Sequence, residues 1–366
     1  MKIECTTNKL KNAVILADRV TGKNLTLPVL SYILFTLKNK ELNLRSTNLS
    51  IGMDIKIPVK SEGEGVFAIK GDVLSNILSN ISNDPILKIE KNENTINITV
   101  NKNKSVLKTI PHEDFPTLPI VDGYEFEIQS KKFIEGLKSV FYSASFSDIK
   151  PEIGSVYIYP EGDTLVFVAT DSFRLAEKKI KIKKHLDFSG VLIPYKNTLE
   201  IMKVLESTQN EDLKITINKN QISFKSGDVY LTSRVVDSSF PDYKQIIPKD
   251  NTTNVLVLKQ DFLNSLKISN VFSDKFNQIT FIINPQKKIF EIDAKNTDLG
   301  ESKTQVESTL KGESIEANFN YKYITDCFQS INSDSVSLDF FTNTKPLVIK
   351  PVGDDTFMYL VMPMHR

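Results

Sequence analysis

The sequence predicts an α+β fold made of three tandem copies of one module, each with two helices and an antiparallel sheet. The first helix opens three times, at intervals of 123 and 129 residues, around Leu10, Phe133 and Phe262. A second helix recurs at intervals of 125 and 125 residues, around Leu74, Leu199 and Ile324. This period exceeds the roughly 20–50 residues of a solenoid repeat, so the repeating unit is a whole domain.

Each copy begins with a short strand, expected within 1–7, 125–130 and 254–259, and the first helix follows it. In the first copy the apolar residues of this helix recur at helical spacing, at Leu10, Ala13, Val14, Leu16 and Ala17. Strands with alternating polar and apolar residues come next, as at Ile33, Phe35 and Leu37.

The second helix is expected within 71–82, 196–207 and 321–332. Two strands separated by an Asn-rich turn then form a hairpin within 86–100, 212–226 and 336–351. A Thr-Asn or Thr-Asp pair also recurs between strands, beginning at Thr47, Thr170 and Thr297. One module therefore contains two helices and about eight strands.

Polar, turn-rich stretches at 119–125 and 248–254 are typical of domain boundaries. They predict three domains, at 1–122, 123–249 and 250–366. If the two helices cover one face of each sheet, equivalent helices of successive domains would lie on a common side.

Composition excludes several classes of protein. The 46 Lys and Arg residues nearly balance the 45 Asp and Glu residues, which excludes a nucleic-acid binder that is basic overall but leaves a local basic surface open. Cys5 and Cys327 have no nearby Cys or His partner, which favours buried thiols in a reducing compartment. No apolar run reaches the roughly 20 residues of a membrane span. We expect a cytoplasmic protein with no membrane partner.

Nothing in the chain predicts catalysis. The histidines His112, His185 and His365 lack metal-ligand spacing, and no nucleotide-binding glycine motif occurs. Asp171 and Ser172 are adjacent, but no base is placed to activate the hydroxyl, and a turn between strands explains them better. We therefore expect no enzymatic activity, no metal and no cofactor.

The helices carry more basic than acidic residues on their exposed positions, namely Lys9, Lys11, Arg19, Lys70, Lys131, Lys138, Lys196, Lys203, Lys267 and Lys322. Lysines that point at phosphates supply attraction independent of sequence. Ordinary solvated helix faces explain the same pattern equally well.

Three segments, ATDSFRLAEKK (169–179), FPDYKQIIPK (240–249) and the terminal YLVMPMHR (359–366), resemble the bacterial DNA polymerase III β subunit family of sliding clamps. LTLPVLSYI (25–33) and NFNYKYITD (318–326) match it too, and the resemblance extends over essentially the whole length.

This resemblance implies the DNA clamp fold, with two chains joined head to tail as a six-domain ring around duplex DNA. Such a processivity factor tethers the polymerase by enclosure and catalyses nothing. Its partners would be double-stranded DNA, the replicative polymerase α subunit, the clamp loader and repair proteins with short Leu- or Phe-bearing peptides. The alternatives are a monomeric three-domain scaffold that does not encircle DNA, and an enzyme with an unrecognised site.

The resemblance also implies a hydrophobic partner-peptide cleft between the second and third domains. Its residues here would be Ile153, Thr170, Arg174, Leu175, Pro241, Ile246, Asn320, Tyr323, Leu360, Met362, Pro363 and Met364. Aliphatic and thioether side chains suit the apolar anchors of varied peptides. On pattern alone, Met362 and Met364 fit a core strand better than a binding surface.

Some positions depart from the family pattern. Ser172, Phe173, Gln245 and His365 change the rim of the cleft and leave its specificity open. The residues that would face DNA are Lys23, Lys150 and Lys196, although Glu152 lies in the same patch. The subunit contact would join Leu107 of the first domain to Val271 and Phe272 of the third.

Overall fold

The computed structural model describes residues 1–22, 26–81, 86–147, 149–208 and 210–364. The chain divides into two compact units, the first made of 1–131 and 199–235 and the second of 132–198 and 236–366. Each unit combines parts of two predicted domains, so the boundaries at 122 and 249 stay a prediction.

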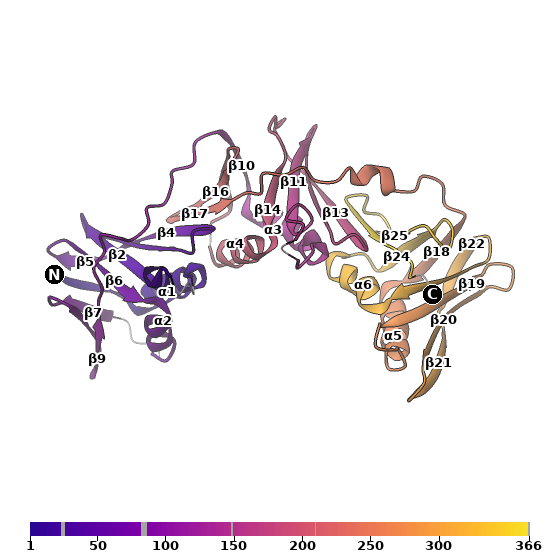
Figure 1. Cartoon of the computed structure of the whole chain (residues 1–366), viewed down its shortest axis with the longest axis horizontal. Coiled ribbons are helices and arrows are strands. Elements are labelled where there is room, and N and C mark those ends of the chain that lie inside the picture. The colour runs from indigo at the N-terminus through magenta and orange to yellow at the C-terminus, as the bar shows by residue number, and fades with distance from the viewer. Residues whose placement is uncertain (23–25, 82–85, 148, 209, 365–366) are drawn as a thin grey trace. The chain divides into compact units, whose positions relative to one another are not determined.

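All six predicted helices occur in the described part of the chain (Figure 1). The first helices of the copies are α1 (Thr7–Val20), α3 (Ser130–Val140) and α5 (Lys259–Asn270). The second helices are α2 (Gly71–Ser79), α4 (Tyr195–Ser207) and α6 (Tyr321–Asp326). Short 3-10 turns occur at Pro28–Ser31, Phe141–Ser143, Tyr243–Ile246 and Cys327–Ser330. The predicted apolar stripe of α1 is buried, which confirms its periodicity.

The first unit contains a five-stranded and an eight-stranded sheet among its described residues, both antiparallel. The five-stranded sheet runs in the order β5 (Lys60–Glu62), β1 (Lys2–Thr6), β7 (Ile86–Lys91), β8 (Thr95–Val100) and β9 (Asn103–Lys108). The eight-stranded sheet runs in the order β10 (Tyr124–Gln129), β15 (Asp212–Ile217), β16 (Gln221–Ser226), β17 (Val229–Arg234), β4 (Ile51–Pro58), β3 (Glu41–Thr47), β2 (Tyr32–Lys38) and β6 (Gly65–Lys70).

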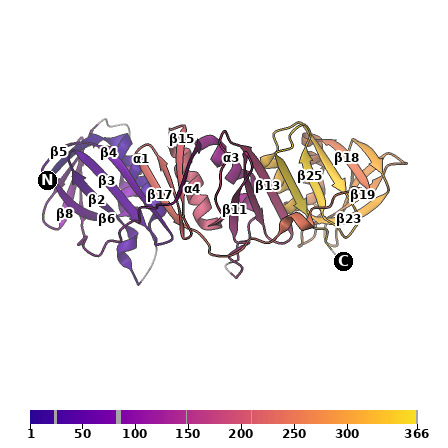
Figure 2. The same cartoon turned by 90° about the horizontal axis from the view of Figure 1, so that it is seen from above.

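The second unit contains a nine-stranded and a four-stranded sheet among its described residues, again antiparallel. The larger sheet runs in the order β14 (Val191–Pro194), β11 (Ser155–Glu161), β12 (Thr164–Thr170), β13 (Arg174–Lys181), β26 (Phe357–Val361), β25 (Leu347–Pro351), β24 (Ser335–Phe340), β18 (Thr253–Leu258) and β22 (Ser308–Gly312). Figure 2 shows β11, β13, β25 and β18 in this succession. The smaller sheet runs in the order β21 (Gly300–Gln305), β20 (Ile289–Asn296), β19 (Gln278–Asn284) and β23 (Ile315–Asn320).

The helices cover the sheets through large buried side chains. Phe262 of α5 is fully buried and packs on Phe281 and Phe290, with ring centroids 5.8 Å away in both cases. In the first unit, Phe35 of β2 and Phe67 of β6 stack within one sheet, with centroids 5.0 Å apart. Burial of each side chain of this size contributes about 1.5–3 kcal/mol of stability.

Two strand pairs join segments that are far apart in the sequence. Strand β4 pairs with β17, and β13 pairs with β26, over five residue pairs each. A loop precedes each inner strand, the 47–51 loop before β4 and the 170–174 loop before β13. Both contain one of the recurring Thr-Asn or Thr-Asp pairs, so the repeat places equivalent loops at equivalent junctions.

Candidate functional site

The 170–174 loop has a backbone set by its Thr-Asp pair. The Thr170 hydroxyl donates to the Arg174 carbonyl at 2.7 Å and accepts from the Ser172 amide at 3.2 Å. Asp171 Oδ1 accepts from the amides of Phe173 and Arg174 at 3.0 Å each. Ser172 consequently lies in the left-handed region, with φ of +78°, which is uncommon for a residue with a Cβ. This turn directs the Phe173 side chain outward and the Arg174 side chain inward.

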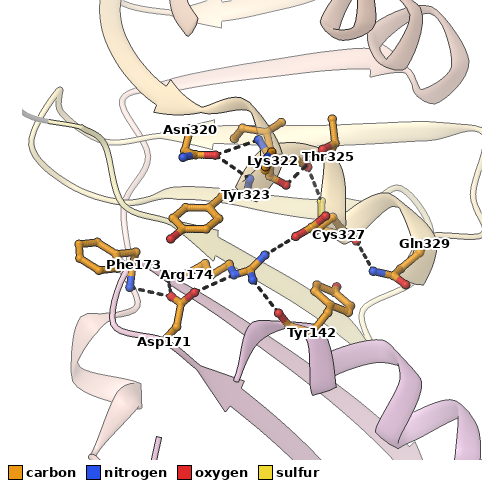
Figure 3. Close-up of polar contacts among 12 residues, drawn as sticks. Tyr142, Asp171, Phe173, Arg174, Asn320, Lys322, Tyr323, Thr325, Cys327 and Gln329 are labelled. Atoms are coloured by element: carbon orange, nitrogen blue, oxygen red, sulfur yellow. Dashed lines mark hydrogen bonds and ion pairs between the residues drawn. The ribbon is translucent and has the colours of Figure 1, made fainter. Parts of the chain in front are cut away.

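Arg174 is 7% exposed and forms the centre of the polar network in Figure 3. Its guanidinium donates to Asp171 Oδ2 at 2.9 Å, to Asp326 Oδ2, and to the Tyr142 carbonyl at 2.7 Å. The Cζ atom also lies 4.6 Å from the centroid of the Tyr323 ring. Burial by itself would lower the pKa of Arg174, but Tyr359, Asp326 and Asp171 outweigh burial and raise it.

These contacts come from the segment before β11, the 170–174 loop and α6. Arg174 therefore ties together three pieces of chain, and Asp326 is 152 residues from it in sequence. A buried guanidinium that has two carboxylate partners and a carbonyl partner stays charged and fixed in place. The surrounding surface is thereby held in one arrangement.

Backbone hydrogen bonds bring the end of the chain to the same place. The Met362 amide donates to the Phe173 carbonyl, and the Met364 amide donates to the Asn318 carbonyl, both at 2.8 Å. The segment after β26 thus lies between the 170–174 loop and the start of α6. Met362 and Met364 are half-buried.

Asn320 caps the N-terminus of α6. Its Oδ1 accepts from the amides of Lys322 and Tyr323, at 2.9 and 3.3 Å, and its Nδ2 donates to the Phe276 carbonyl at 3.1 Å. The cap sets the first turn of the helix, which carries Tyr323. The Tyr323 ring then stacks on Phe173 with centroids 6.4 Å apart (Figure 3).

The linker at 240–247 packs over the neighbouring part of the sheet. Tyr243 is 5% exposed and lies in one buried cluster with Leu175 and Leu360. Its hydroxyl donates to Glu177 Oε2 and lies 2.8 Å from the Tyr159 hydroxyl. Burial, together with the Glu177 carboxylate, raises the pKa of Tyr243. The linker is therefore anchored at its centre.

The residues predicted for the peptide cleft fall into two groups. Arg174, Leu175, Leu360 and Pro363 are buried and support the surface from beneath, as Thr170 does. Exposed or half-buried residues face outward, namely Pro241, Ile246, Asn320, Tyr323, Met362 and Met364. Ile153 is linked to the Arg174 network only indirectly. Its carbonyl accepts from the amide of Ser145, which lies three residues after Tyr142.

Sequence reasoning missed the two residues that hold Arg174, Asp326 and Tyr142. Phe173, which the sequence analysis placed at the rim of the cleft, is 60% exposed beside Arg174. Gln245 donates to Asp242 at 2.7 Å within its own linker, and His365 lies outside the described residues.

The predicted DNA-facing residues are placed as follows. Lys150 and Lys196 are exposed, and their segments are joined by a hydrogen bond of 2.9 Å from the Tyr195 amide to the Gly154 carbonyl. Lys23 lies outside the described residues. Two apolar residues beside Lys150, Phe146 and Ile149, are 71% and 88% exposed, and sequence reasoning did not single them out.

The predicted subunit contact involves two edge strands. Leu107 is half-buried on β9, the edge of the five-stranded sheet. Val271 is 62% exposed and Phe272 is half-buried, directly after α5. A Cβ placed on Gly300 would lie 3.9 Å from the Phe272 ring, so Phe272 is next to the start of β21, the edge of the four-stranded sheet.

Within the described residues, no three His, Cys, Asp or Glu side chains gather as metal ligands. None of the described helices is long and apolar enough to cross a membrane.

Sequence models for three domains of one protein match the chain in order. They describe the DNA polymerase III beta subunit, with its N-terminal domain at 1–119, central domain at 127–242 and C-terminal domain at 244–365. The beta sliding clamp of Synechococcus elongatus is 27% identical over 100% of this chain and 99% of its own. That of Staphylococcus aureus is 25% identical over 93% of each chain.

Solved structures agree. The DNA polymerase III beta subunit of Thermotoga maritima has a TM-score of 0.94 and 27% identity, over 100% of this chain and 99% of its own. The sliding clamp of Bacillus subtilis, at 22% identity, has a TM-score of 0.94 over 100% and 99%, which shows the same fold. The alternative of a monomeric scaffold gains no support. The chain belongs to the bacterial DNA polymerase III β subunit family, the sliding clamps, which are non-catalytic homodimeric subunits that hold the polymerase on DNA.

Proposed function

We propose that this clamp binds the polymerase α subunit, the clamp loader and other replication and repair proteins through the surface around Arg174. The observation that carries the proposal is the exposure of apolar side chains on a rigid support. Phe173 is 60% exposed next to Arg174, which two carboxylates fix, and Ile246 is 51% exposed on the linker that Tyr243 anchors. Exposed apolar residues on an ordered base are typical of protein-binding sites.

A short peptide with Leu or Phe anchors suits this surface. Burial of each anchor contributes about 1.5–3 kcal/mol, so two or three anchors give an affinity that still allows exchange between partners. Met362 and Met364 are flexible thioethers that adapt to different anchors. Phe173 and Tyr323 add stacked rings at one side, which favours an aromatic anchor there.

The test is peptide binding to a variant that changes only residues facing outward from the surface. Leu175 is unsuitable because it is 1% exposed in a buried cluster. We expect Ile246→Ala with Met362→Ala to abolish binding of an uncharged Leu/Phe peptide, measured by fluorescence anisotropy, without changing the solution mass. Unchanged affinity in this double variant would place the peptide site elsewhere.

We propose that Lys150 and Lys196, with Lys23, contact the enclosed DNA through phosphates. Such contacts are independent of sequence and weaken with salt. We expect Lys150→Ala with Lys196→Ala to lower the slope of log affinity against log salt by about 1–2. The protein, once loaded, should stay on circular DNA and slide off linear DNA.

We propose that the two chains join where β9 of one meets β21 of the other, with Leu107 against Val271 and Phe272. Exposed edge strands pair readily with a second strand. We expect Leu107→Glu to halve the mass found by light scattering. A dimer in this variant would contradict the assignment.

We also propose a cytoplasmic location. Cys5 and Cys327 are both buried and free of disulfides, as suits a reducing compartment. Burial raises the pKa of Cys5 to about 11, so this thiol is unreactive at neutral pH.

A further inference from the structure

The junction between β4 and β17 carries two adjoining cavities in the first unit. The smaller has a volume of about 110 Å³ and is lined by residues that include Leu49, Ile51, Leu118, Gln221, Thr232 and Arg234. The larger has a volume of about 500 Å³ and is lined by Asn218, Asn220, Gln221, Arg234 and Val235. Because Gln221 and Arg234 line both, the cavities form one groove with an apolar and a polar half.

The charge of the groove is positive. Arg234 is the one charged residue among the described residues that line the two cavities. It is exposed, and its guanidinium makes no hydrogen bond or ion pair within the described part of the chain. Its backbone amide, by contrast, is fixed by a 2.8 Å hydrogen bond to the Ser50 carbonyl. A free guanidinium on an anchored strand is suited to a carboxylate.

A second polar group points to a ligand. Thr232 is 3% exposed and lines the smaller cavity, and its hydroxyl has no hydrogen-bond partner among the described residues. A buried hydroxyl without a partner costs about 1–3 kcal/mol, which a bound polar group would recover. Thr232 and Arg234 are two residues apart on β17, so both side chains lie on one face of the sheet.

The apolar half of the groove has an exposed entrance. Leu49 is 42% exposed, and Leu118, in the segment between β9 and β10, is half-buried on the other side. A cavity of about 150 Å³ holds a benzene ring, so about 110 Å³ is enough for a branched aliphatic group.

We propose that this groove is a second binding site, which takes a peptide segment with an aliphatic residue beside an acidic one. The aliphatic side chain enters the smaller cavity between Leu49 and Leu118. The carboxylate pairs with Arg234 at the border with the larger cavity and accepts a hydrogen bond from the Thr232 hydroxyl on the same face of β17. The site is separate from the surface around Arg174 and does not depend on it.

The probe for the test is a blocked pentapeptide, acetyl-Gly-Leu-Asp-Leu-Gly-amide, with photo-leucine as its first Leu. It is crosslinked to the full-length protein, and the crosslinks are mapped by mass spectrometry. We expect crosslinks at 49–51 and 116–119, both in the natural sequence and in the Ile246→Ala, Met362→Ala variant that lacks the first site. Arg234→Glu should lower the affinity at this position about tenfold or more, and Arg234→Lys should keep part of it.

A matched peptide with Asn in place of Asp should crosslink more weakly at the same positions, and higher salt should weaken the acidic peptide. Circular dichroism and solution mass establish that each variant is folded and dimeric. Equal crosslinking in Arg234→Glu, or equal crosslinking of the Asn peptide, would overturn the proposal. Crosslinks confined to 241–246 and 362–364 would also overturn it. That result would still agree with peptide binding at the surface around Arg174.

Discussion

The 47–51 loop and the 170–174 loop share one backbone and differ in their chemistry. In both, a threonine hydroxyl bonds to the carbonyl four residues on, at 2.9 and 2.7 Å. In both, an Asn or Asp side chain accepts two amides. The third residue has a positive φ in each, +72° at Leu49 and +78° at Ser172. The carbonyl of the fourth loop residue also accepts from an amide of the paired segment. Ser50 accepts from Arg234 and Phe173 accepts from Met362, both at 2.8 Å.

The side chains then separate the two junctions. Arg174 and Lys178 on β13 correspond to Ile51 and Ile55 on β4, so one junction is ionic where the other is aliphatic. Lys178 is 6% exposed and forms ion pairs with Glu135 at 3.0 Å and with Asp354 at 3.8 Å. Leu175 corresponds to Gly52, and Phe173 to Ser50. A duplicated loop therefore keeps its backbone hydrogen bonds while its side chains acquire different partners.

The largest effect should come from Arg174→Ala. Removing the guanidinium leaves Asp171 without its ion pair, with a side chain only 14% exposed, and we expect the free energy of unfolding to fall by about 3–5 kcal/mol. Asp326 is 41% exposed, which favours the lower end of that range. Urea unfolding is the measurement. At the aliphatic junction, Ile51→Val should cost about 0.5–1.5 kcal/mol. An equal loss of unfolding free energy in Arg174→Ala and Ile51→Val would show that the ionic and the aliphatic junction do not differ in this respect.

A smaller effect is expected at position 52. A Cβ on Gly52 would lie 2.3 Å from Cδ2 of Leu118, so Gly52→Ala must displace that side chain, and we expect a cost of about 1–3 kcal/mol. In a Leu118→Ala background the clash disappears. The two changes should therefore be non-additive in a double-mutant cycle of unfolding free energies. Additive costs would show that Leu118 does not occupy the space over β4.

Phe173→Ala should separate binding from stability. Because the ring is 60% exposed, the free energy of unfolding should change by less than about 0.5 kcal/mol. The affinity for an uncharged Leu/Phe peptide should fall about tenfold, or about 1.4 kcal/mol. Leu49→Ala, at the other loop, should leave that affinity unchanged. Equal losses for the two variants would show that the peptide does not distinguish the loops.

The smallest effect concerns pH. Burial opposes ionisation of Asp354, but Thr356 and Lys178 outweigh it and lower the pKa of Asp354 in the folded chain. The unfolded chain thus binds this proton first. The stabilisation is complete above the ordinary aspartate pKa of about 4 and is lost as the pH falls further, through the lowered folded pKa.

Asp354→Asn should therefore flatten the loss of stability at acidic pH, measured as the urea midpoint from pH 6 to pH 3. Because Asp354 is 40% exposed, the change should be small. Ile55→Val, on the aliphatic junction, should leave the shape of the pH profile unchanged. An identical profile for Asp354→Asn and the natural sequence would contradict the assignment.

Much of the fold was predictable because its signals are local. The apolar spacing from Leu10 to Ala17 marks a buried helix face wherever the helix packs, and the Thr-Asn and Thr-Asp pairs mark turns through bonds within five residues. The third pair behaves differently. There, Asn296 accepts from the amides of Asp298 and Leu299, so the Thr297-Asp298 pair does not repeat the arrangement.

The candidate site was predictable as a set of positions through resemblance, but its physical organisation was not. Asp326, Tyr142 and Arg174 come together only when β13 pairs with β26 and α6 packs nearby. No local pattern marks Asp326 as the partner of an arginine 152 residues away.

The threefold module and the places of its helices and turns can be read from the order of the amino acids, since periodicity and turn chemistry act over a few residues. Tertiary contacts are needed to know which of the two equivalent loops has a buried charge and an exposed ring, and which lies by an unpaired arginine and a cavity. Burial and ion pairing depend on side chains that strand pairing brings together from distant segments, so no stretch of sequence records them.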